Sequence, residues 1–175
     1  AEHMTEFKLL SSIDLGGHRM NFSSLRAFPA LQVLHLSCNH ISDIQLPNID
    51  KDCGFKNLTA LDLSYNKCSS DSLLELGSLP NLSFLDLSQN QLQNFPDITK
   101  AHFKSLKKLV LRGNELGKVK PSDGPAPPNT YHDPESSYFK PHYTFFSVLA
   151  QLPTLREVDL SSNLIQVIPR LPPGS

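Results

Sequence analysis

Leucine recurs in this chain at a spacing that leaves few alternatives for the fold. The pattern L-x-x-L-x-L-x-x-N-x-L, with Ile, Val, Cys or Met at some of the Leu positions, aligns six times, starting at residues 10, 31, 58, 82, 106 and 155. Leucine fills 29 of the 175 positions, and only His18, in the first copy, replaces the asparagine. Self-similarity at such a period indicates an array of stacked structural units.

The pattern itself predicts the structure of one unit. Its central x-L-x-L-x segment alternates with period two, so it predicts a short strand with leucines facing inward and variable residues facing outward. The asparagine follows at the turn, where its side-chain amide can satisfy buried backbone groups that would otherwise be unpaired. Because no unit can bury its own apolar side chains, stability must come from stacking.

Together these features resemble the leucine-rich repeat family. The first four spacings between repeats, 21, 27, 24 and 24 residues, fit its usual range of ~20–29, whereas the last is 49. The resemblance implies an α/β fold: a right-handed solenoid with a parallel sheet on the concave face, and helices and irregular turns on the convex face. We expect one domain of six repeats over residues 5–170, an insertion at 117–144, and a tail at 171–175.

Two of the segments that connect one predicted strand to the next have sequences typical of helices. The run Ser69–Ser72 predicts an N-cap, and the helix that follows it should close at Gly77 and Pro80. A second helix is expected to begin near Phe145, because apolar residues there recur at helical spacing: Phe145, Val148, Leu149 and Leu152.

Outward positions of the strands form the candidate binding surface. Neighbouring strands lie ~4.8 Å apart, so equivalent positions stack in columns, acidic in the middle of the face and basic in the fifth repeat. Two aromatic residues there are candidates for contact area. The candidate partner-binding residues on this face are Asp14, His35, Asp62, Tyr65, Phe84, Asp86, Lys108 and Arg112. The alternative is that Leu-Asp-Leu-Ser is repeat consensus, kept for solubility and local hydrogen bonds.

The same column raises the question of a metal site. Carboxylates and an imidazole at Asp14, His35, Asp62 and Asp86 could reach one cation. A charged ladder without a metal is far more common, and His132, Asp133 and His142 have no ordered spacing. We therefore predict no metal and no cofactor.

The insertion is the feature that most distinguishes this chain from its repeats. Residues 117–148 contain no leucine, and six prolines lie between Pro121 and Pro141. We expect 120–130 to be extended and mobile, and 138–146 to be anchored, with Tyr138 and Phe139 bordering the binding groove. The alternative is a passive surface insertion, because long loops cost little extra closure entropy.

Composition excludes several function classes. With 16 basic and 17 acidic residues the net charge is −1, so no basic excess for direct nucleic-acid binding is present. No apolar run reaches the ~20 residues of a membrane helix, and no phosphate loop, nucleophile elbow or Cys-His pairing at a motif spacing occurs. We expect a non-catalytic, monomeric protein-binding module or scaffold with no membrane contact.

Location is indicated by cysteines and sequons. The three cysteines form no cluster of the kind that caps many extracellular leucine-rich domains, which favours the cytoplasm or nucleus. Sequons occur at Asn21, Asn57 and Asn81, but repeat consensus generates the last two. The alternative is a secreted or cell-surface recognition domain, suggested by Asn94–Pro96 and by Phe103 before a template leucine.

Four longer segments resemble one member of the family. They are Phe22–Leu31, Leu61–Asn66, Leu74–Leu82 and Asn90–Pro96, and an insertion before the final repeat is shared. This resemblance implies a link to a DNA-damage response.

Overall fold

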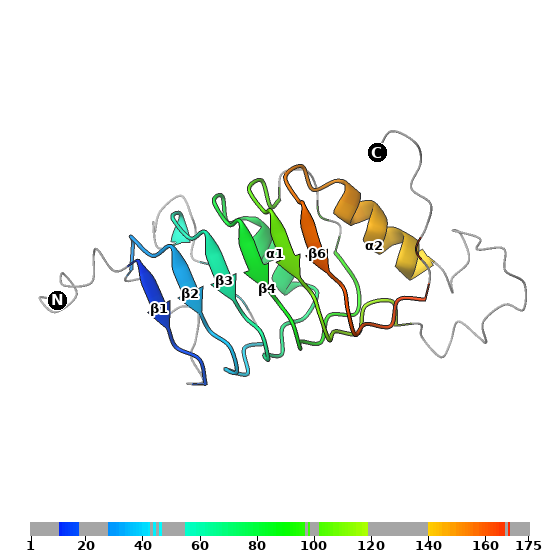
Figure 1. Ribbon diagram of the computed structural model, residues 1–175, viewed down its shortest axis with the longest axis horizontal. Coiled ribbons are helices and arrows are strands. Elements are labelled where there is room, and N and C mark those ends of the chain that lie inside the picture. Colours follow the sequence, from blue (N-terminus) through cyan, green and yellow to red (C-terminus); the bar gives the residue numbers. More distant parts are fainter. Residues whose placement is uncertain are drawn as a thin grey trace, which may run out of the picture.

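In the computed structural model, six short parallel strands lie side by side in chain order and form one sheet (Figure 1). The structure describes residues 11–17, 28–42, 44, 46, 55–96, 98, 102–118, 140–166 and 168. The strands are β1 Ser12–Asp14, β2 Val33–His35, β3 Ala60–Asp62, β4 Phe84–Asp86, β5 Lys108–Val110 and β6 Glu157–Asp159. Each strand occupies the third to fifth positions of the leucine pattern, as the alternation predicted.

The register between strands confirms the assignment of inward and outward residues. Leu61 pairs with Leu85, and Leu85 with Leu109, so the leucines of successive repeats stack in one column. All three are fully buried, whereas the strand residues on either side of each leucine retain exposed surface. The chain is therefore a solenoid whose core is a stack of leucines behind the sheet.

Burial of the core depends on where a repeat stands in the stack. The middle residue of each strand in the inner repeats, such as Leu34 or Leu85, is fully buried. Their counterparts in the first and last repeats, Ile13 and Val158, are only partly buried. An inner repeat is covered on both sides by neighbours, whereas a terminal repeat of the described stack is covered on one.

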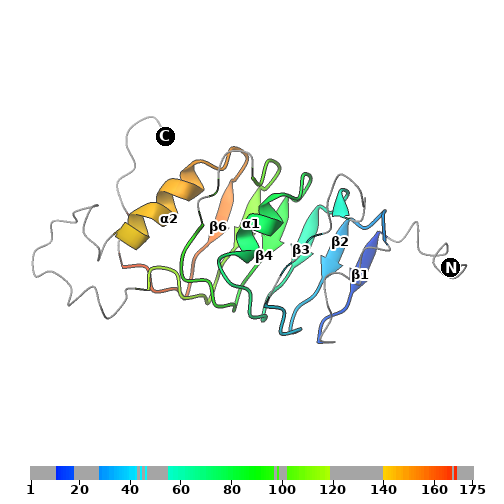
Figure 2. The same cartoon turned by 180° about the vertical axis from the view of Figure 1, so that it is seen from behind.

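Two helices, α1 at Ser72–Gly77 and α2 at Lys140–Ala150, pack on the opposite side of the sheet from its open, concave face. Figure 2 shows α1 in front of the strands and α2 beside β6. Buried Phe145 of α2 contacts Phe95 edge-to-face, with ring centroids 5.2 Å apart. The chain is thus anchored to the solenoid at Phe145, directly after the insertion.

Both helices differ in detail from their sequence predictions. Asp71, at the N-cap of α1, has helical backbone angles and makes no capping side-chain bond, because the chain enters the helix through a turn. Helix α2 begins at Lys140, five residues before the predicted start at Phe145. Pro141 does not prevent this, because the first turn of a helix needs no donor there. Tyr138 and Phe139, with residues 119–137, lie outside the described residues.

An asparagine ladder closes the turn after each strand. The Oδ1 atom of Asn66 accepts hydrogen bonds from the backbone N–H of Asn39 (3.1 Å) and Ile41 (2.8 Å) in the preceding repeat. Its Nδ2 donates to Leu36 O (2.9 Å) across the same boundary and to Leu63 O (3.0 Å) within its own repeat. The ladder predicted from the ninth position is confirmed, and Asn90, Asn114 and Asn163 repeat it.

The eighth residue of each repeat, which precedes the asparagine or His18, adopts a left-handed backbone that was not predicted from the sequence. The φ angles are 75° at Gly17, 58° at Cys38, 55° at Tyr65, 56° at Gln89, 69° at Gly113 and 56° at Ser162. A non-glycine residue pays roughly 1–2 kcal/mol for this conformation. The glycines at positions 17 and 113 could have indicated the left-handed turns, because glycine adopts a positive φ without steric cost.

Two cysteines among the described residues are free thiols in opposite environments. Cys38 is exposed, whereas Cys68 is buried at a core position of the third repeat. Burial raises the pKa of the Cys68 thiol to about 12, because the thiolate would lose its hydration.

This contrast predicts selective alkylation. In a Cys53→Ser variant at pH 8, Cys38 should react with iodoacetamide while Cys68 stays unmodified until the protein unfolds, since the thiolate is the nucleophile. Mass spectrometry of peptides after timed quenching measures both rates. Equal rates in the native protein would mean that the third repeat is not packed as described.

Candidate partner-binding surfaces

The concave face carries an ordered column of charged side chains. Along the sheet, Asp14 pairs with His35, His35 with Asp62, and Asp62 with Asp86. His35 Nδ1 lies 3.6 Å from Asp62 Oδ2, so the imidazole stands beside a carboxylate. The structure therefore brings together the four column residues that the sequence singled out.

Each aspartate of this column also has a structural role. Asp62 Oδ1 accepts a hydrogen bond from Ser64 N (2.8 Å), and Asp86 Oδ1 accepts from both Ser88 N (2.8 Å) and Ser88 Oγ (2.6 Å). Asp14 accepts in the same way from Gly16 N at 3.0 Å. Local hydrogen bonding thus explains the Asp-Leu-Ser consensus and fixes each carboxylate on the face.

The positive charge of the fifth repeat is partly neutralised by the sixth. Lys108 Nζ lies 2.8 Å from Glu157 Oε2, and this bond raises the pKa of Lys108. Hydrogen bonds from Ser161 lower the pKa of Asp159, and Arg112 lowers it further through its charge. The basic fifth repeat expected from the sequence therefore faces two acidic partners on β6, Glu157 and Asp159.

The aromatic candidates lie next to the acidic column. Phe84 is half-buried on β4 in the middle of the face, and Tyr65 is 61% exposed at the left-handed turn after β3. A large aromatic side chain that stays exposed on a rigid turn can be covered at little entropic cost. These two residues offer the apolar contact area of the face.

No metal-binding geometry forms in the described ranges. No group of three or more His, Cys, Asp or Glu side chains there could hold a metal ion. The candidates His132 and Asp133 lie outside the described residues, and so does the side chain of His142. Likewise, no described helix is both long and apolar enough to cross a bilayer.

A second polar ladder runs along the other ends of the strands. In the third, fourth and fifth repeats, the residue just before the first leucine donates to a carbonyl of the preceding repeat: Asn57 Nδ2 to Pro29 O (2.8 Å), Asn81 Nδ2 to Lys56 O (2.7 Å) and Ser105 Oγ to Pro80 O (2.8 Å). Thr154 Oγ1, before the sixth repeat, donates to the equivalent carbonyl, Lys104 O (3.3 Å), and also to Leu106 O (2.8 Å). The sequon asparagines Asn57 and Asn81 therefore have a structural use between repeats.

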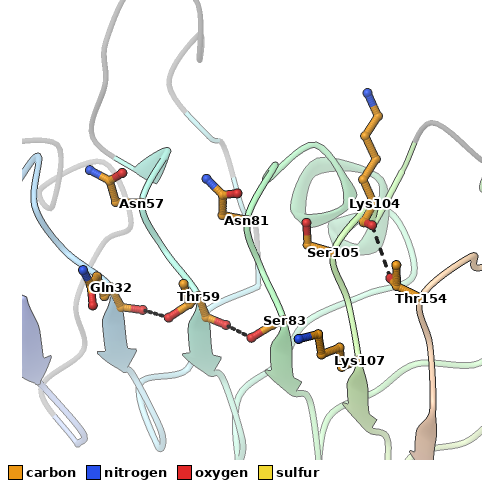
Figure 3. A pocket seen from close by; sticks show the side chains of 9 residues that line it. All are labelled: Gln32, Asn57, Thr59, Asn81, Ser83, Lys104, Ser105, Lys107 and Thr154. Carbon is orange, nitrogen blue, oxygen red and sulfur yellow. Dashed lines mark hydrogen bonds between the residues drawn. The ribbon is translucent and has the colours of Figure 1, made fainter.

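The side chains of this ladder line a groove that we call the edge groove (Figure 3). Its volume is about 560 Å³, and it runs from the second repeat to the start of the sixth. Besides the ladder residues it is lined by Gln32, Thr59, Ser83, Lys104 and Lys107. Thr59 and Ser83 donate to the main chain of their neighbours, at 3.0 Å each. The outward strand positions did not indicate this groove, because its lining residues lie at the second position of a repeat or just before a repeat begins.

Comparison with known proteins agrees with the fold. Residues 29–92 match the family model described as leucine rich repeat. A solved leucine-rich repeat protein of Leptospira interrogans superposes on 93% of this chain and 40% of its own, with a TM-score of 0.54 and 25% identity. The chain belongs to the leucine-rich repeat family, whose fold generally serves as a non-catalytic scaffold for binding proteins.

Among individual proteins, the chain is similar to mouse X-ray radiation resistance-associated protein 1, with 32% identity over 151 residues. It is also similar to the rat leucine-rich repeat-containing G-protein coupled receptor 5 (32% over 154 residues) and to Drosophila melanogaster chaoptin (28% over 155 residues). These alignments cover 82%, 86% and 87% of this chain. They cover 17%, 16% and 11% of the relatives, so the chain spans less than a fifth of each relative's length.

Proposed function

We propose that this protein is a non-catalytic scaffold that binds a protein partner on the concave face of its sheet. The observation that carries the proposal is Tyr65, which remains 61% exposed at the turn after β3, while half-buried Phe84 and the aspartates lie on β3 and β4. Aromatic anchors surrounded by fixed charges are typical of binding hot spots. The partner-binding residues are those of the face: Asp14, His35, Asp62, Tyr65, Phe84, Asp86, Lys108 and Arg112.

The strands provide a rigid base for such contacts. Asp62 and Asp86 are held by turn hydrogen bonds, so a partner would not have to order them. Preorganised groups lose little entropy on binding. The charge along the face changes from negative at Asp62 and Asp86 to positive at Lys108 and Arg112, which favours a partner with the complementary order of charges.

To test this, partners are captured with the wild-type protein, and one is then purified and titrated by calorimetry. The double variant Tyr65→Ala, Phe84→Ala should bind it at least about tenfold more weakly, because hot-spot aromatics carry much of the binding energy. The matched control is Leu74→Ala, which removes an exposed apolar side chain from α1 on the other side of the sheet. Equal affinity of the wild type and the double variant would refute the proposal.

We propose that the insertion contributes to the same surface through Tyr138 and Phe139. This rests on the sequence, since aromatic side chains there carry apolar area that water disfavours. Anchoring of the neighbouring helix by Phe145 against Phe95 supports it. The variant Tyr138→Ser, Phe139→Ser should weaken the same partner without unfolding the domain, and unchanged affinity would assign the insertion a passive role.

We further propose that the protein works in the cytoplasm or nucleus. The free thiols of Cys38 and Cys68 support a reducing compartment. Its likeness to a protein named for X-ray radiation resistance supports a link to that response, for which survival of irradiated cells lacking the protein is the test. The alternative, a secreted or cell-surface recognition domain, is supported by the likeness to a G-protein coupled receptor, and glycosylated Asn57 in folded protein from cells would favour it.

A further inference from the structure

Positive charges gather on the edge of the solenoid that holds the edge groove. Lys56, Lys104, Lys107 and Arg156 all lie within two positions of a first template leucine, at the same ends of the strands. Among the described residues, none of the four forms an ion pair, whereas Lys108 and Lys118 do. The residues that line the groove include two lysines and no acid. Asp62 and Asp86 lie three positions further along their repeats than Thr59 and Ser83, whereas Glu157, which follows Arg156, is paired with Lys108.

Two of these cations stand directly beside each other. Arg156 N donates to Lys107 O at 2.9 Å, and the next residues, Glu157 and Lys108, are paired in the sheet register. Like charges at opposite positions of neighbouring strands destabilise a sheet. An anion lying against this edge would relieve that repulsion.

We propose that the edge groove binds an acidic, extended segment of a partner protein, with its carboxylates at Lys104 and Lys107. The groove is separate from the concave face, so this inference does not rest on the function proposed above. A volume of about 560 Å³ accommodates a few residues of an extended chain.

The neutral lining suits a peptide main chain. Asn57 and Asn81 each give one amide hydrogen to a carbonyl of the preceding repeat, which leaves Oδ1 and the second hydrogen available. Gln32 adds a third exposed amide from the second repeat (Figure 3). Primary amides both donate and accept, as backbone peptide groups require.

The same lining disfavours a nucleic acid. None of the residues that line the groove is aromatic, so it offers no platform on which bases could stack. A long polyanion would also pass close to the aspartates of the concave face, Asp62 and Asp86, which repel it. A short acidic segment can contact the cations without reaching these carboxylates.

The test measures fluorescence anisotropy with a labelled peptide of alternating Glu and Gly. We expect binding at low salt that weakens as salt rises, and about tenfold weaker binding by Lys104→Glu, Lys107→Glu, since each reversal replaces an attraction by a repulsion. The matched control is Lys67→Glu, Lys118→Glu, which changes the net charge equally on the asparagine-ladder side. Circular dichroism checks that both variants fold.

Three outcomes would overturn the proposal. One is that the acidic peptide binds no more tightly than a Ser-Gly peptide of the same length. Another is that both double variants weaken binding equally, which would indicate a net-charge effect. The last is tighter binding of a single-stranded oligonucleotide that depends on Lys104 and Lys107. The variant Tyr65→Ala, Phe84→Ala should bind the acidic peptide as the wild type does, so failure here is distinguishable from failure of the concave-face proposal.

Discussion

Replacing Leu87 by alanine is expected to lower the free energy of unfolding by about 2–5 kcal/mol, because it opens a cavity in a closely packed stack. Leu87 is fully buried in the fourth repeat, with a repeat on each side. Urea denaturation followed by circular dichroism measures the change.

Leu160 offers a matched control for this experiment. It occupies the same position of the leucine pattern in the last repeat but is only partly buried. The same Leu→Ala change should therefore cost clearly less there, since less packing is lost. Equal losses at Leu87 and Leu160 would contradict the description of a core whose burial depends on neighbouring repeats.

Replacing Asn66 by alanine should have a comparably large effect, a loss of about 3 kcal/mol or more, because buried backbone groups left without partners cost roughly 1–3 kcal/mol each. Asn39 N and Ile41 N would lose their acceptor, and Leu36 O would lose a donor. Thermal and urea unfolding of the variant measure the loss.

Alanine variants of the other ladder asparagines should lose less stability than the Asn66 variant. Replacing Asn163 by alanine should lower the free energy of unfolding less, because this residue is only partly buried. Asn90→Ala should lower it by roughly 1–3 kcal/mol. Asp86→Asn should change stability little, because the amide oxygen can still accept from Ser88 N. If Asp86→Asn destabilised the protein more than Asn90→Ala, the assignment of inward and outward residues would be wrong.

The leucine pattern was sufficient to predict the strands because its alternation is a direct consequence of burial. Leu61, Leu85 and Leu109 stack as expected, and the asparagines bridge repeats as their buried position requires. The outward columns followed from the same register. For this part of the molecule, the local sequence and the packing of neighbours impose the same structure.

Other features depend on contacts that a local reading does not contain. The left-handed turn at Tyr65 is imposed by the geometry of the coil, against the preference of its own residue. Helix α2 starts before Phe145 because Pro141 is compatible with a first turn, although proline usually signals a boundary. The edge groove combines side chains from five repeats, and each of those side chains looks ordinary in its own repeat.

The central claim, that the concave face is the protein-binding surface, is tested most directly by hydroxyl-radical footprinting of the purified complex. The account predicts that partner binding protects Tyr65 and Phe84 from oxidation, while Leu74 on α1 is oxidised at the same rate in both states. Protection of Leu74 with unchanged oxidation of Tyr65 and Phe84 would contradict it.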